Sequence, residues 1–119
     1  MVTDRPKVPP LYWIVSADGR PVVLEGGVGG KKLDFFPFFT TRENAQRHYD
    51  QSYMAGKRIT SSDDPAELRD LIEGRAPERA AFLIDVEGFA GPRVQPLLAG
   101  EILEIVEYNV GASEWDLGY

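Results

Sequence analysis

The sequence contains no cysteine, and this absence removes whole classes of chemistry. The 119 residues include no thiol for a disulfide, a covalent nucleophile or a thiolate metal site. Because disulfides belong mainly to oxidising compartments, a chain without them fits the cytoplasm, and we expect that location. No stretch approaches the roughly 18 apolar residues that a membrane-spanning helix needs, and the first ten residues lack the apolar core of a signal peptide. We therefore expect no membrane partner.

Positive charge is scarce and scattered. The chain has 13 basic and 19 acidic residues, and five of the acids lie in residues 101–119, which contain no Lys or Arg. Binding to nucleic acid needs clustered positive charge that displaces counterions from phosphates. The pairs Lys31–Lys32 and Lys57–Arg58 are not such a cluster. We expect no nucleic-acid partner, and the confinement of the acids to one end disfavours a mimic of nucleic acid.

Histidine occurs once, at His48, so no histidine pair is available to bind a metal. His48 falls at the border of an apolar helix face, and Asp50 is too close in sequence to orient it as a general base. We predict a boundary histidine with a solvent or backbone partner. Asp63 and Asp64 resemble paired carboxylates, but a helix cap explains Asp64 and a turn explains Asp63. The sequence therefore indicates no catalytic residue, no metal site and no cofactor.

Glycines are concentrated in one segment, Gly26–Gly30, which precedes two lysines. A phosphate-binding loop would need a glycine where Glu25 stands and a hydroxyl where Lys32 stands. The dinucleotide fingerprint fails as well, because its third glycine also falls on Lys32. We predict a flexible connector or a hairpin loop.

Three strands are expected before the first helix. Residues 11–15 are rich in β-branched and aromatic side chains, and a turn at residues 16–19 leads to a second arm at residues 22–24, which predicts a hairpin. Residues 33–39 contain four phenylalanines and predict a third strand. Because Pro37 cannot donate to a ladder, we expect this strand at a sheet edge or with a bulge.

Capping signals predict two helices in the middle of the chain. Thr40 and Glu43 form a capping box for a helix that ends at Gly56. Asp64, followed by a proline in the first helical turn, predicts a second helix that ends at Gly74.

The remaining apolar segments predict further strands. We expect a short strand at residues 58–60 and a central strand at residues 81–86. Residues 101–108 fit either a helix or a strand, and their β-branched side chains favour a closing strand.

These elements predict an α+β fold. We expect a two-layer sandwich, with a mixed sheet of about five or six strands and two helices on one face. Residues 1–10 are interpreted as a flexible N-terminal arm because three prolines lie among charges. Residues 11–108 form a single α+β domain, and residues 109–119 form an acidic, aromatic C-terminal tail.

Four features of the central part of the chain occur together: the opening hairpin, Phe38-Phe39-Thr40-Thr41 running into Glu43-Asn44-Ala45, Asp64-Pro65-Ala66-Glu67-Leu68, and the strand Ala81–Val86. In these features the chain resembles the SseB-like (enhanced serine sensitivity) family of small bacterial domains. The resemblance covers at most residues 11–107, and both the segment Gly26–Gly30 and the C-terminal tail depart from the family pattern. It implies an α+β fold and a poorly understood, non-enzymatic role, and it transfers no functional residue.

Aromatic residues supply the leading hypothesis about function. Neighbours along a strand point to opposite faces, so some aromatic rings must be covered by the arm, the tail or a second subunit. We expect a non-catalytic protein-interaction module, acting on a protein partner or by self-association as a homodimer. The residues expected on the interaction surface are Trp13, Phe36, Phe38, Trp115 and Tyr119.

The alternative hypothesis is a small-ligand-binding protein or minor enzyme. Its pocket would lie between the opening hairpin, the loop Gly26–Gly30 and the loop Glu87–Gln95. Asp85, Glu87 and Arg93 would then be its ligand-binding polar groups.

Overall fold

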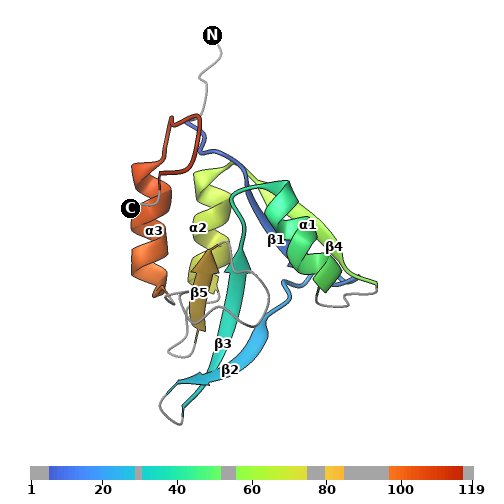
Figure 1. The fold of residues 1–119 in the computed structure, drawn as a ribbon. Helices are drawn as coiled ribbons and strands as arrows, with labels where there is room; N and C mark the ends of the chain where they lie inside the picture. Colours follow the sequence, from blue (N-terminus) through green and yellow to red (C-terminus); the bar gives the residue numbers. More distant parts are fainter. Residues whose placement is uncertain (1–5, 29–30, 52–55, 75–79, 85–96, 117–119) are drawn as a thin grey trace.

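A computed structural model describes residues 6–28, 31–51, 56–74, 80–84 and 97–116. The protein is an α+β protein, as predicted (Figure 1). Its elements occur in the order β1 (Leu11–Val15), β2 (Leu24–Val28), β3 (Lys31–Phe38), α1 (Arg42–Gln51), β4 (Arg58–Ser62), α2 (Pro65–Gly74), β5 (Ala80–Ile84) and α3 (Ala99–Tyr108).

The strands form two sheets. β1 pairs with β4 in an antiparallel ladder that runs from Leu11 opposite Ser62 to Val15 opposite Arg58. β3 is the middle strand of the second sheet, antiparallel to β2 and parallel to β5. The predicted mixed character is therefore confined to the second sheet. Within the described ranges, the strands divide into sheets of two and three, and they do not form the single sheet of five or six that we predicted.

β3 changes its neighbour at Pro37. Its ladder with β2 ends where Phe35 faces Leu24, and beyond the proline Phe39 exchanges two backbone hydrogen bonds of 2.8 Å with Tyr12. Backbone N–H groups two residues apart point to the same side of a strand, so the nitrogen of Pro37 faces the side of β1 and β2, away from β5. Proline thus occupies a place where neither neighbour needs a donor. β3 is central in its sheet, and the expected edge position exists only locally, at this gap.

The turn after β1 forms as expected, but the predicted hairpin is minimal. Gly19 has a φ of 84°, and the Ser16 N–H donates to the Arg20 carbonyl at 2.9 Å. Of the predicted second arm, the structure shows one donation from the Val22 N–H to Ile14 at 2.8 Å, beside an isolated bridge between Val15 and Pro21. The predicted hairpin of residues 11–15 with 22–24 therefore forms only at its first positions. Farther along the same edge of β1, Tyr12 bonds to Phe39, Leu24 belongs to β2, and β4 pairs along the opposite edge. The glycines expected in a connector at 26 and 27 belong to β2, while Gly29 and Gly30 lie outside the described residues.

The structure confirms the predicted cap of α2 and corrects that of α1. The Ala66 N–H donates to the Asp64 carboxylate at 2.9 Å, which confirms Asp64 as the cap of α2. α1 begins one residue later than predicted, because its cap is Thr41, whose hydroxyl accepts from the Asn44 N–H at 3.1 Å. We had assigned the cap to Thr40. The two adjacent threonines carry the same hydroxyl group, so the sequence alone could not distinguish them.

α3 replaces the strand that we favoured for residues 101–108. Ile102 and Val106 are four residues apart and 1% and 2% exposed, whereas Glu101 and Glu104 are exposed. This helical period outweighs the strand preference of the β-branched residues. The Glu101 carboxylate also accepts from the Leu98 N–H at 3.1 Å and stabilises the start of the helix.

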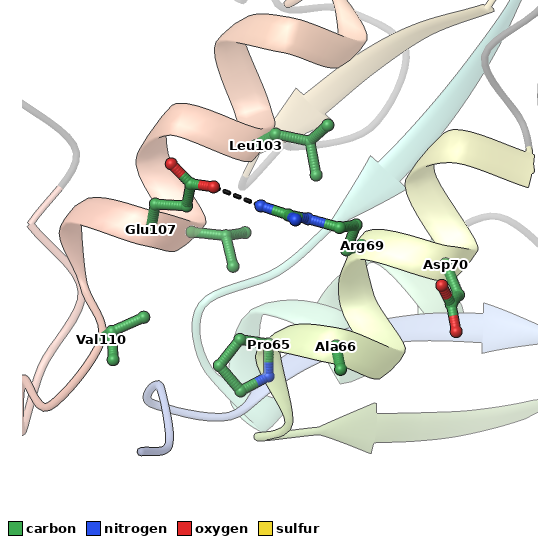
Figure 2. A pocket seen from close by; sticks show the side chains of 8 residues that line it. Pro65, Ala66, Arg69, Asp70, Leu103, Glu107 and Val110 are labelled. Atoms are coloured by element: carbon green, nitrogen blue, oxygen red, sulfur yellow. Dashed lines mark hydrogen bonds and ion pairs between the residues drawn. The ribbon is translucent and has the colours of Figure 1, made fainter. Parts of the chain in front are cut away.

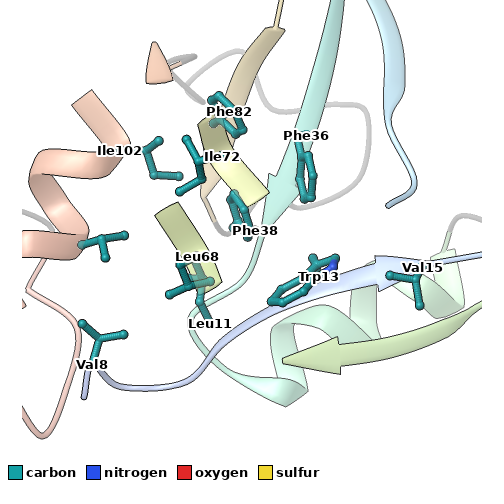
Figure 3. Close-up of a cluster of buried hydrophobic side chains, with 11 residues drawn as sticks. Val8, Leu11, Trp13, Val15, Phe36, Phe38, Leu68, Ile72, Phe82 and Ile102 are labelled. Carbon is teal, nitrogen blue, oxygen red and sulfur yellow. The ribbon is translucent and has the colours of Figure 1, made fainter. Parts of the chain in front are cut away.

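The core consists of two clusters on opposite faces of β1, and Figure 3 shows the larger one. Alternate residues of β1 enter the larger cluster, which α2 and α3 cover, while Ile14 enters the smaller cluster, which contains Ala45 of α1. The two helices that share a face are therefore α2 and α3, and the two helices that we predicted lie on opposite faces of β1. The buried members of the larger cluster are Val8, Leu11, Trp13, Val15, Phe36, Phe38, Leu68, Ile72, Phe82, Ile102 and Val106.

The two ends of the described chain lie against each other. Val8 is 3% exposed, and its N–H donates to Asp63 at 3.0 Å. The Gly111 N–H donates to the Lys7 carbonyl at 2.7 Å, and the Trp115 indole donates to Pro10 at 2.9 Å. Parts of the predicted arm and tail thus cover the core, while the boundaries of residues 11–108 as a domain stay a prediction. None of the helices in the described part of the chain combines the length and apolar character needed to cross a bilayer.

Candidate functional site

A groove between α2 and α3 is the candidate site that the described residues present (Figure 2). Its volume of about 350 Å³ lies at the lower end of the range of ligand pockets, which is roughly 300–1,000 Å³. Three of the lining side chains are charged, namely Arg69, Asp70 and Glu107. The apolar lining residues are Pro65, Ala66, Leu103, Val106 and Val110.

Helical spacing explains how the sequence builds this groove. Leu103, Val106, Glu107 and Val110 are spaced i, i+3, i+4 and i+7, so they form one stripe at the side of α3 and its C-terminal turn. On α2, Leu68 points into the core, and Pro65, Ala66 and Arg69 line the groove beside α3. Because Pro65 and Ala66 are small, they leave a hollow beside the larger side chains of α3.

An ion pair joins the two sides of the groove. The Arg69 guanidinium of α2 donates to the Glu107 carboxylate of α3 (Figure 2). Their side chains are 49% and 63% exposed, so water and salt screen the attraction, and a pair of this kind contributes at most about 1 kcal/mol to stability. The contact is therefore open to exchange.

Acidic charge is concentrated on the same two helices. α2 and α3 carry six carboxylates and one basic side chain, Arg69, which gives the pair a net charge of −5 in a chain whose net charge is −6. All six acids belong to exposed residues. They are Glu67, Asp70, Glu73, Glu101, Glu104 and Glu107. The helix pair thus presents a negative potential around a partly apolar groove.

Large apolar side chains are exposed at the C-terminal end of α3. Tyr108 is 72% exposed, and Val110, which lines the groove, is 39% exposed. The opposite end of α3 shows a third such residue, Leu98, which is 66% exposed. Sequence analysis missed the groove because residues 101–108 were interpreted as a strand. The acids at positions 101, 104 and 107, with apolar residues between them, have the spacing of one polar helix face, and this spacing was the signal that could have identified the helix.

Three of the residues predicted for an interaction surface are buried instead. Trp13, Phe36 and Phe38 are 6%, 1% and 0% exposed, and the ring centroids of Phe36 and Phe38 lie 4.6 Å apart. The prediction was wrong for these three because α2 and α3 cover that face of β1 and β3. Trp115 is half-buried against the larger cluster, and Tyr119 lies outside the described residues.

The predicted ligand-binding residues Asp85, Glu87 and Arg93 also lie outside the described residues. The same holds for the loop Glu87–Gln95 and for the two glycines that connect β2 to β3. The alternative pocket therefore stays a prediction from sequence.

His48 is buried, contrary to its predicted boundary position. It is 1% exposed, and neither ring nitrogen has a hydrogen-bond partner in the described part of the chain. Its ring lies 5.2 Å from that of Phe39, centroid to centroid, and burial lowers the pKa of the imidazole. His48 follows Ala45 by three residues, so it shares the helix face that packs on the strands. No carboxylate among the described residues is bonded to it, so none of them orients it as a base.

No family model matches the sequence, and no curated protein matches it. In the described ranges, no group of three or more His, Cys, Asp or Glu side chains is arranged to hold a metal ion. The groove between α2 and α3 is thus the feature on which a functional interpretation rests.

Proposed function

We propose that this chain is a non-catalytic protein-interaction module that binds a basic segment of a partner protein in the groove between α2 and α3. One observation carries the proposal, the coincidence of an apolar groove with six exposed carboxylates on its two helices. Apolar contact supplies affinity, and charge selects the partner and speeds its approach.

Charge decides between the occupants that such a groove could take. Phosphate groups of nucleic acid or of a lipid surface would be repelled by a helix pair of net charge −5. A second copy would bring the same acidic surface, so self-association through this groove is disfavoured. A partner segment with Lys or Arg beside apolar residues would meet both Glu107 and the exposed Val110. The occupant is therefore a basic, amphipathic segment of another protein.

The remaining expectations about the chain belong to this proposal. A cytoplasmic setting and the resemblance to SseB-like domains, which implies a non-enzymatic role, are compatible with it. The two-layer sandwich applies to the second sheet, with α2 and α3 as the layer that covers β3 and β5. Contact among Ile72, Ile102 and Phe82 within the larger cluster supports this arrangement.

Titration with a synthetic amphipathic peptide of leucine and arginine tests the proposal. Amide resonances of the ¹⁵N-labelled protein should shift at the groove, above all at Leu103 and Val110. Glu107→Gln should weaken binding several-fold, because it removes the carboxylate that a cation would meet and frees Arg69. Asp18→Asn is the matched control, since it removes one exposed acid from the turn after β1.

The outcomes separate the possible occupants. Shifts spread evenly over the acidic surface, or equal weakening by Glu107→Gln and Asp18→Asn, would contradict a groove-specific site. Concentration-dependent shifts at the groove without any peptide would show a second copy there and would overturn the choice of partner.

A further inference from the structure

We propose that Arg69 is a resident competitor in the groove, a cation of the protein itself that holds Glu107 until the partner's cation displaces it. This inference rests on the proposed function and specifies how the same site is regulated. It assigns to Arg69 the role of setting affinity and specificity.

The charge pattern singles out Arg69. It is the one basic side chain of α2 and α3, among six acids, and it lines the groove instead of facing away from it. Figure 2 shows the guanidinium directed across the groove to Glu107, from one helix to the other. A partner's arginine or lysine would need the same carboxylate. The contact seen in the free protein therefore has the chemistry that we expect of the complex.

The packing shows that Arg69 is not needed to join the helices. Leu68 and Ile72 of α2 are fully buried against Ile102 and Val106 of α3, which are 1% and 2% exposed. The charged pair lies outside this contact, with both side chains about half exposed. Removing the guanidinium should leave the helix pair intact and the carboxylate available.

Competition between Arg69 and the partner's cation should change the affinity for the partner by a measurable factor. When the binding-competent state is only a fraction of the molecules, the apparent affinity falls by that fraction. An exposed ion pair is populated only a few times more than its open form. We therefore expect Arg69→Gln to tighten binding of a basic peptide about three- to sixfold.

The test compares four proteins against the same leucine–arginine peptide at low and moderate salt. Wild type and Arg69→Gln are compared for the gain, and Arg69→Lys, which keeps the charge, should bind nearly as wild type does. Arg58→Gln removes an equal charge from the exposed start of β4 and controls for overall electrostatics. Thermal unfolding of each variant, followed by circular dichroism, confirms that all four are folded.

Each outcome bears on one proposal or on both. Equal affinity of wild type and Arg69→Gln, with shifts still at the groove, would overturn the competitor role and leave the docking site standing. A gain with Arg58→Gln as large as that with Arg69→Gln would overturn it too, because the effect would then be one of net charge. Absence of groove shifts in every variant would overturn both proposals.

Discussion

His48 occupies an environment that an imidazole rarely tolerates without a partner. It lies on the buried face of α1 beside Phe39, with neither ring nitrogen hydrogen-bonded in the part of the chain described. A buried polar group without a partner costs about 1–3 kcal/mol relative to one that stays hydrated. Burying a charged imidazolium at this place would cost far more free energy than burying the neutral ring.

The position of His48 predicts a loss of stability on mild acidification. Burial lowers the pKa of the folded imidazole below its ordinary value of 6.5, so the unfolded chain takes up the proton first. Stability contributed by the neutral ring is therefore fully present above about pH 6.5 and declines as the pH falls towards the folded pKa. Urea unfolding between about pH 7.5 and 5 should show this decline.

Two variants of His48 separate titration from burial. His48→Leu should remove this pH-dependent part and raise the free energy of unfolding at neutral pH by about 1 kcal/mol, because no orphaned polar atom is left. His48→Gln should also remove the pH-dependent part but without that gain. An unchanged pH profile in both variants would show that other groups cause the decline.

Secondary structure was predictable where a residue acts on its neighbours and was missed where distant segments compete. The cap of α2 depends on Asp64 and on an N–H two residues later, so the sequence alone located it. The partner of β1 depends on which segment reaches it in space: Phe39 bonds to Tyr12 on the edge that the predicted hairpin needed, while β4 pairs along the other edge. α3 was misassigned because side-chain preference was given more weight than the spacing of Ile102 and Val106.

The side-chain amide of Asn109 links the end of α3 to the segment that follows it. Asn109 is fully buried, and its side chain donates to the carbonyls of Ile105 and Asp116, both at 2.8 Å, and accepts from the Asp116 N–H at 2.7 Å. It therefore links the last turn of the helix to the segment that contains Trp115. No residue near it in sequence predicts this bond set, since Asn is common at any helix end.

Replacing that amide should release the segment after α3. Asn109→Ala should lower the free energy of unfolding by about 1–3 kcal/mol, because buried backbone groups lose their partners. Trp115 should become more accessible to acrylamide, and its emission should move to longer wavelength. Ser113→Ala, in an exposed part of the same segment, is the matched control and should change neither quantity.

A second substitution identifies the reporter. Trp115→Phe, in combination with Asn109→Ala, should abolish the emission change, since Trp13 is buried in the larger cluster. Unaltered quenching in Asn109→Ala would show that other contacts hold the segment.

At the scale of the whole molecule, the order of the predicted strands and helices indicated the α+β class of the fold. The site itself could not be predicted, because it lies between two helices that are separated by 24 residues in sequence, and one of them was assigned as a strand. The prediction of an exposed aromatic surface was wrong for a related reason. Alternation along β1 and β3 is local, whereas burial of Trp13 and Phe36 depends on helices that come much later in the chain.

The larger cluster should fail without the C-terminal helix. A chain of residues 1–96 lacks Ile102 and Val106, and each such side chain contributes about 1.5–3 kcal/mol when buried. It also lacks the bridge between Phe82 and Leu97 and uncovers Leu68 and Ile72. Against a total stability of about 5–15 kcal/mol, we expect no cooperative thermal transition.

Circular dichroism and proton–nitrogen correlation spectra would check this expectation. A chain that ends at Asp116 is the matched control and should unfold cooperatively. A sharp transition in the shorter chain would mean that the two sheets and α1 fold independently of α3.

The contact between Gly111 and Lys7 has a practical consequence for handling the molecule. Val110, beside that contact, lines the groove, so a dye or surface linkage attached at Lys7 would crowd the opening that a partner must enter. Ala17 lies in the exposed turn after β1 and offers an attachment point elsewhere. Pull-down baits and biosensor surfaces prepared through that turn would leave the groove unobstructed, whereas baits attached through Lys7 would under-report binding.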